Sequence, residues 1–161
     1  MRKAVAPICA HCNQPSVLVG GDVIWPNRTD RHAQFFWRCV PCAAYVGCHK
    51  NTKRPLGIPA NDELRQARIL LHNRMVDPLW RTAVESVGYT PEDPKARKII
   101  MNTARSRVYE FLAWKLGIER DECHVAEFDL EMCRRAWRAL QGVDYVMIRS
   151  WAKERRQDAA E

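Results

Sequence analysis

Two pairs of cysteines near the N-terminus have the spacing of a metal-binding site. Cys9 and Cys12 form one C-x-x-C turn. Cys39 and Cys42 form a second, after twenty-six intervening residues. Two such turns can place four thiolates around one Zn²⁺ in the tetrahedral arrangement that this ion prefers. Since four protein ligands leave no open position for water, we expect one structural zinc ion whose binding contributes to folding.

Further cysteines and histidines lie beside these pairs and later in the chain. They are His11, Cys48, His49, Cys123, His124 and Cys133. His11 could replace a cysteine as ligand, but we expect the four cysteines to bind the ion. Cys48 is expected to pack as a small apolar side chain on a strand. Cys123, His124 and Cys133 provide too few ligands for a second site. The better interpretation is that Cys123 is a loop thiol and Cys133 a thiol packed on a helix.

Nearly all of the excess positive charge lies in the cysteine-rich segment. Residues 1–60 contain eight Lys or Arg and two acidic residues, a balance of +6, whereas residues 61–161 have a balance of +1. This asymmetry favours a polyanionic partner at the N-terminal end. We predict contacts with DNA or RNA phosphates from Lys50, Lys53, Arg54, Arg38 and Arg28.

Aromatic residues flank these cations and could stack on bases. On a strand, Phe35 and Trp37 share one face and Phe36 takes the other, so one of the two sets is expected to be core. Tyr45 follows shortly after the second cysteine pair.

The segment that must bring the cysteine pairs together has strand-forming sequences. Residues 16–25 contain two β-branched runs around Gly20, Gly21 and Asp22, which predicts a hairpin. Residues 33–39 predict a third strand that leads into the second pair, and residues 43–47 are also strand-like. So small an antiparallel sheet could not bury a core of its own, which makes a metal staple plausible.

The remainder of the chain has helical periodicity. A first helix from Asn61 or Asp62 to about residue 75 should stop near Pro78. The other expected boundaries are a start at Thr90 or Asp93, a stop at Gly117, a cap at Asp129 with a helix to about Leu140, and a last start at Gly142 or Asp144. We therefore predict an α+β protein: a zinc-ribbon-like antiparallel β-sheet (residues 1–60) packed on a bundle of about four α-helices (residues 61–161) as one compact unit.

The catalytic motifs that we considered are absent from the sequence. It has no phosphate-binding loop, no H-E-x-x-H and no nucleophile elbow. Asp62, Glu63, His72 and Asp77 could form a metal-dependent nuclease site, but carboxylates at helix starts ordinarily act as caps. We expect no enzyme activity and no small-molecule substrate.

No apolar run approaches the roughly 20 residues that a membrane span needs, and no signal-peptide pattern precedes Cys9. We expect a cytoplasmic protein without a membrane partner.

The order of several motifs resembles a known family. These motifs are the two cysteine pairs, "AYVGCHKNTKRPLG", "DPLW", "ARSRVYEFLAWKLGI", "CHVAEFD" and "CRRAW". In this order they resemble the zinc-finger-containing domain proteins of bacteriophages and prophages. The resemblance implies a zinc-binding domain with no assigned activity, acting in a bacterial or phage-infected cell. The resemblance says little about function, so the sequence leaves two interpretations open: a zinc ribbon that binds nucleic acid, or an adaptor or inhibitor that binds a host protein.

Overall fold

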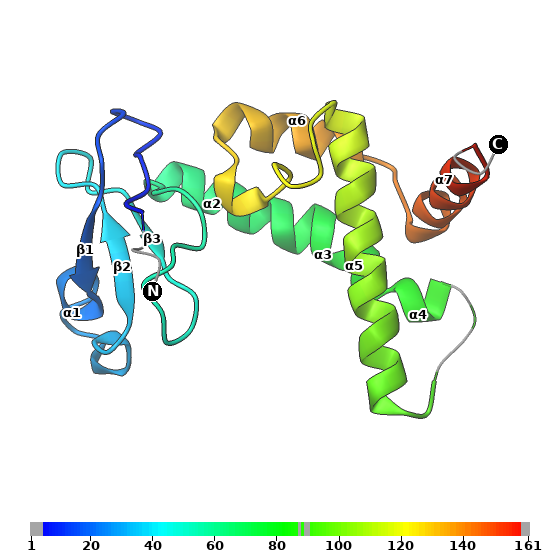
Figure 1. Cartoon of the computed structure of the whole chain (residues 1–161), viewed down its shortest axis with the longest axis horizontal. Helices are drawn as coiled ribbons and strands as arrows, with labels where there is room; N and C mark the ends of the chain where they lie inside the picture. The colour runs from blue at the N-terminus through cyan, green and yellow to red at the C-terminus, as the bar shows by residue number, and fades with distance from the viewer. Residues whose placement is uncertain (1–4, 87, 89–90, 159–161) are drawn as a thin grey trace. The chain divides into compact units, whose positions relative to one another are not determined.

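The structure, a computed structural model, describes residues 5–86, 88 and 91–158, which fall into two compact units (Figure 1). The first unit covers residues 1–67 and the second covers residues 68–161. The expectation that the parts pack together as one unit stays a prediction. Within the described ranges, no helix is long and apolar enough to cross a membrane.

A three-stranded antiparallel sheet forms the centre of the first unit. Its strands are β1 (Val17–Gly20), β2 (Phe35–Arg38) and β3 (Tyr45–Gly47), in the order β1-β2-β3. In this register Leu18 and Val46 both lie opposite Trp37. The predicted N-terminal antiparallel sheet is therefore confirmed.

The hairpin that we predicted within residues 16–25 is wrong. After β1 the chain forms the short helix α1 (Gly21–Ile24), and a 3-10 turn (Thr29–Arg31) precedes β2. A Cβ atom at Gly21 would collide with the carbonyl oxygen of Arg31, so the glycine serves this close approach of two backbone segments and not a hairpin. Trp25 then packs edge-to-face on Phe36 and Tyr45, with ring centroids 4.8 and 5.2 Å apart.

Helices form most of the second unit. Helix α2 (Asp62–Leu71) begins in the first unit, and the division between the units falls within it. A π-helical segment (His72–Val76) and α3 (Asp77–Arg81) follow. The others are α4 (Ala83–Ser86), α5 (Pro94–Leu116), a 3-10 turn (Val125–Glu127), α6 (Leu130–Leu140) and α7 (Tyr145–Asp158).

The ends of these helices have the capping contacts that the sequence predicts. The side chains of Asp93 and Asp129 accept hydrogen bonds from the backbone of Lys95 and Met132, respectively. Asn61 Oδ1 accepts from the Leu64 N–H at 2.9 Å, and Asp144 Oδ1 accepts from the Met147 N–H at 2.8 Å. Gly117 ends α5 with a φ of 68°, a left-handed conformation that favours glycine. The alternative start at Thr90 lies outside the described residues.

Pro78 does not stop the first helix, contrary to our prediction. It follows the π-helical segment, in which the N–H of Asp77 donates to the carbonyl of His72, five residues earlier. Because the wider turn changes which carbonyls lie near the proline, helical backbone continues through α3.

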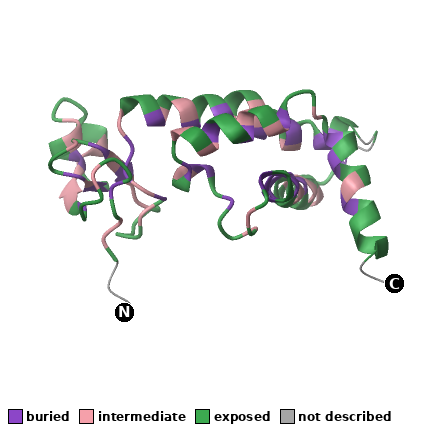
Figure 2. Ribbon diagram, turned by 90° about the horizontal axis from the view of Figure 1, so that it is seen from above, coloured by how far each residue is buried: buried purple, intermediate pink, exposed green. Residues whose placement is uncertain are grey.

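The core of the second unit gathers along α5. Ala104, Val108 and Leu112 are completely buried on this helix, as the sequence periodicity indicates. Helices α6 and α7 pack against α5 and contribute Ala136 and Ile148. Figure 2 shows such buried positions (purple) recurring between exposed ones (green) along the helices.

Candidate metal centre and basic ribbon surface

The two predicted cysteine pairs meet in space. The Sγ atoms of Cys9, Cys12, Cys39 and Cys42 all lie within 4.8 Å of one another. The Sγ atoms of Cys12 and Cys39 are 3.3 Å apart, well beyond the S–S bond of about 2.05 Å in a disulfide, and all four thiols are free. A tetrahedral zinc site with Zn–S bonds of about 2.3 Å has sulfur–sulfur edges of about 3.8 Å. The cluster fits such a site.

Matching turns position the two pairs. In the first, the Cys9 N–H donates to the Gln14 carbonyl, and Asn13, directly after Cys12, has a φ of 56°. In the second, the Cys39 N–H donates to the Ala44 carbonyl at 2.8 Å. Ala43, directly after Cys42, has a φ of 54°. A left-handed conformation costs a non-glycine residue roughly 1–2 kcal/mol, so the surrounding contacts must hold these turns in place.

Burial and mutual contact shape the thiol chemistry. Cys9 and Cys39 are completely buried and form a small core with Ala44, while Cys12 and Cys42 are half-buried beside it. Hydrogen bonds from Cys42 and Cys39 lower the pKa of Cys12, and the same contact with Cys12 raises the pKa of Cys42 to about 12. Burial raises the pKa of Cys39. Thiols held this closely resist joint ionisation unless a cation compensates their charge.

Comparison with known families agrees with this geometry. A family model described as a zinc-finger-containing domain matches residues 5–90, more than half of the 161 residues. The chain belongs to this family. The matched region of the zinc-finger protein includes the sheet, the four cysteines and helices α1–α4, and it ends before α5. No curated protein and no solved structure matches the chain significantly.

The four-cysteine cluster fits one structural zinc ion, as predicted, and membership of a zinc-finger-containing family agrees with this. When bound, the ion joins the N-terminal turn to the end of β2. Cys9, Cys12, Cys39 and Cys42 would hold it, and they leave no position for a substrate.

The other candidate ligands of the zinc-finger protein lie outside this cluster. In the part of the chain that the structure describes, no other group of three or more Cys, His, Asp or Glu could hold an ion. His11 Nε2 instead accepts a hydrogen bond from the Asn61 N–H at 3.3 Å, which connects the first cysteine turn to the start of α2. Cys48 is half-buried after β3, and Cys123 and Cys133 are buried in the helical unit. Burial raises the pKa of Cys123 to about 11.

The basic turn after β3 is fixed by hydrogen bonds. The His49 N–H donates to the Arg54 carbonyl, and the Thr52 hydroxyl donates to the His49 carbonyl at 3.0 Å. Trp37 Nε1 donates to the Lys53 carbonyl at 2.9 Å from beneath the turn. The side chains of Lys50, Lys53 and Arg54 are exposed on this turn.

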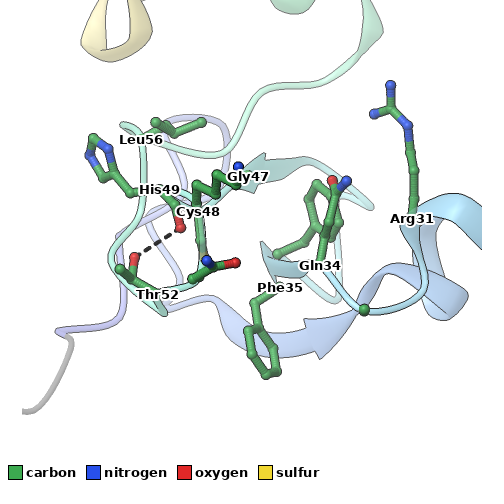
Figure 3. A pocket seen from close by; sticks show the side chains of 12 residues that line it. Arg31, Gln34, Phe35, Gly47, Cys48, His49, Thr52 and Leu56 are labelled. Atoms are coloured by element: carbon green, nitrogen blue, oxygen red, sulfur yellow. Dashed lines mark hydrogen bonds between the residues drawn. The ribbon is translucent and has the colours of Figure 1, made fainter.

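A pocket of about 690 Å³ lies beside this turn (Figure 3). Its lining includes Phe35 from β2, Arg31 from the preceding 3-10 turn, and His49 and Lys50 from the basic turn. Phe35 is 40% exposed, and the ammonium of Lys53 lies 5.3 Å from its ring centroid. None of the lining residues within the described part of the chain is acidic. We had not predicted a role for Arg31, because nothing in the sequence distinguishes it from other loop cations.

The remaining predicted cations have different surroundings. Arg38 is half-buried on β2 and does not line the pocket. Arg28 is exposed but forms two 2.9 Å hydrogen bonds with the carboxylate of Asp30, so an acid already compensates its charge. These contacts favour Lys50, Lys53 and Arg54 over Arg28 as contacts for an anion.

Both faces of the sheet contain buried aromatic rings, although we expected only one set to be core. Phe36 packs with Trp25 and Tyr45 on one face, and Trp37 lies under the basic turn on the other. Of the three consecutive aromatic residues on β2, only Phe35 is exposed to solvent.

The carboxylates that we considered for a nuclease site have structural contacts. Asp77 accepts hydrogen bonds from Trp80 Nε1 and Arg81, and its Oδ1 lies 3.4 Å from His72 Nδ1. Asp62 pairs with Arg65 at 2.8 Å. Both acids therefore have local partners within their own helical segments.

Proposed function

We propose that this zinc-finger protein binds single-stranded nucleic acid, DNA or RNA, through its ribbon and catalyses no reaction. The observation that carries the proposal is the exposed ring of Phe35 at a pocket with a basic, acid-free lining. A flat aromatic surface beside cations suits an unstacked base and its phosphates, because every base can stack on a ring whatever its sequence.

The size and charge of the pocket support this ligand class. Its volume of about 690 Å³ is within the range of small-molecule sites, so it could hold one nucleotide. Lys50 and Arg31 line it, and Lys53 lies over Phe35, so phosphates on either side of a stacked base would have cations within reach. Zinc has a structural role here, since it fixes the turn from which β3 and the basic turn continue.

Fluorescence anisotropy with a labelled oligothymidylate across a salt series tests the proposal. Lys50→Gln/Lys53→Gln is expected to flatten the slope of log K against log[salt] by about 1.4, because each lost phosphate contact on a single strand contributes about 0.7. Phe35→Ala is expected to weaken binding by roughly 1–3 kcal/mol through lost stacking.

The matched control is Arg28→Gln/Asp30→Asn, which removes an ion pair from the same unit without changing its net charge. This variant should bind as the wild type does. Absence of binding even at low salt, or binding by Phe35→Ala equal to that of the wild type, would refute the proposal.

A second candidate is an adaptor or inhibitor that binds a host protein. The resemblance to phage and prophage proteins supports action in the cytoplasm of a bacterial host. The observation that favours this role is the exposure of Trp114, which is 48% exposed. Its ring centroid lies 5.5 Å from that of Trp151, and both residues line a pocket of about 430 Å³. Exposed tryptophans are frequent anchors of protein interfaces. A stoichiometric host protein retained by the wild type and lost with Trp114→Ala would support this role; retention by both would count against it.

A further inference from the structure

A second basic pocket lies in the helical unit. It has a volume of about 630 Å³ and is lined by Arg107 from α5 and by Arg149, Lys153 and Arg156 from α7. Ser150 and Gln157 add polar groups, and none of the described residues that line it is acidic. We call this pocket, with its four cations, the α5–α7 basic groove.

Acidic partners do not compensate these charges. Among the described residues, none of the four cations of the α5–α7 basic groove forms a salt bridge. Helix α6 shows the usual alternative, because Arg134 and Arg138 both pair there with Glu131. Four like charges around one pocket repel one another, so an anion that entered it would relieve that repulsion.

Arg107 is held in position within the groove. It is half-buried, and one guanidinium nitrogen donates to the Tyr145 hydroxyl at 3.4 Å. Its Nε is buried without a hydrogen-bond partner. Buried Arg68, by comparison, donates two hydrogen bonds to the Phe128 carbonyl. Arg107 lines the pocket, and among the described residues no carboxylate forms a salt bridge with its guanidinium, so this group can donate to an anion there.

The spacing along α7 indicates more than one anionic group. Arg149, Lys153 and Arg156 follow one another at steps of four and three residues, which places them on one helix face. At about 1.5 Å per residue they span roughly 10 Å, which is longer than a single phosphate needs.

We infer that the α5–α7 basic groove binds a row of linked phosphate groups, as in a nucleic-acid backbone. Arginine and lysine N–H groups would donate to the phosphate oxygens, without contacts that read the bases. The identity of the polyanion rests on the proposed function, whereas the anion site itself does not. The groove would be a second contact, distinct from the ribbon pocket.

Two full-length variants test the inference. Arg149→Gln/Lys153→Gln removes two exposed, unpaired cations, and Arg134→Gln/Arg138→Gln removes two cations that Glu131 already compensates. Both change the net charge equally, and circular dichroism with zinc analysis checks that both fold. With the labelled oligothymidylate, the first variant is expected to flatten the salt slope by about 1.4 relative to the wild type. The control should leave the slope unchanged.

A second probe separates the possible sources of phosphate. Inorganic tripolyphosphate, followed by calorimetry, is expected to bind the wild type and the control variant but not Arg149→Gln/Lys153→Gln. If tripolyphosphate binding depends on these cations but the oligonucleotide slope does not, the groove is a phosphate site for a smaller molecule. An unchanged oligonucleotide slope together with no tripolyphosphate binding overturns the inference. Binding only to vesicles of phosphatidylcholine and phosphatidylserine also overturns it, in favour of a membrane surface.

The same data separate this inference from the proposed function. If Lys50→Gln/Lys53→Gln and Phe35→Ala bind the oligonucleotide as the wild type does, the ribbon proposal fails. If Arg149→Gln/Lys153→Gln still flattens the slope in that experiment, the groove proposal stands.

Discussion

Removal of zinc is expected to unfold the β-ribbon and to leave the helical core folded. The sheet has strands of only four, four and three residues. Part of what holds it is the small core of Cys9, Cys39 and Ala44, which the metal completes. The helices α5, α6 and α7 have 23, 11 and 14 residues and pack around a separate core.

The magnitudes indicate why the two units should respond differently. Structural zinc in small cysteine-containing domains contributes about 10–16 kcal/mol near neutral pH. Whole domains have net stabilities of only about 5–15 kcal/mol, so the ribbon without zinc should lose most or all of its stability. The helical unit has its own buried side chains, including Val108, Leu112 and Ile148, each worth about 1.5–3 kcal/mol on burial. No described residue of this unit belongs to the metal cluster.

Hydrogen exchange read by mass spectrometry, before and after chelation of the full-length protein, measures this difference. Amides of β2 should lose protection, whereas those of α5 should keep it. Cys39→Ala should reproduce the chelated state, and the matched control Cys48→Ala should retain zinc and protection, since Cys48 lies outside the cluster. Protection of β2 in the zinc-free protein would show that the sheet does not need the ion. Loss of protection in α5 at the same chelator concentration would show that the two units unfold together.

Four further perturbations have defined outcomes. With zinc bound, iodoacetamide should modify half-buried Cys48 before buried Cys123 and Cys133, as peptide mass spectrometry can show; equal rates would contradict the burial described above. Since burial raises the pKa of Cys123 to about 11 from an ordinary value of 9.0, its stabilising contribution is complete below pH 9.0 and declines as the pH rises towards 11. The urea midpoint should therefore fall over that range, and less so in Cys123→Ala; identical pH profiles would exclude this thiol as a cause. Gly117→Ala should lower the free energy of unfolding in urea by roughly 1–2 kcal/mol, because alanine is strained at a φ of 68°. Steric overlap should add nothing, since no atom lies within 4 Å of the added Cβ. Gly21→Ala should destabilise the ribbon through steric overlap, because the added Cβ meets the Arg31 carbonyl; unchanged exchange in β1 would contradict this.

Features that depend on short sequence distances could be predicted well. The two C-x-x-C pairs predicted the metal cluster because each pair sets the positions of its own two thiols. The caps Asp93 and Asp129 and the stop at Gly117 were predictable for a related reason, since each acts on backbone groups within a few residues.

Features that depend on distant contacts could not be predicted in this way. Residues 22–25 have strand-like composition, but the approach of Gly21 to Arg31 and the packing of Trp25 select a helical turn. Likewise, the charge balance along the sequence predicts an anion-binding surface on the ribbon alone. The α5–α7 basic groove was not predictable in this way, because it combines Arg107 with cations more than forty residues later. A net charge near zero over a segment conceals how its positive and negative groups are distributed in space.

The number of residues in the π-helical segment His72–Val76 decides whether a proline is tolerated at position 78. An α-helix rotates by about 100° per residue, so the five-residue step from Leu71 to Val76 would turn Val76 about 140° away. The wider turn rotates less per residue, and both side chains stay buried. A chain that lacked the exposed residue Asn73 could place Leu71 and Val76 on one buried face with an ordinary α-helix. It would then bring the ring of Pro78 against the carbonyl four residues earlier. Loss of that one residue and replacement of the proline would therefore have to occur together.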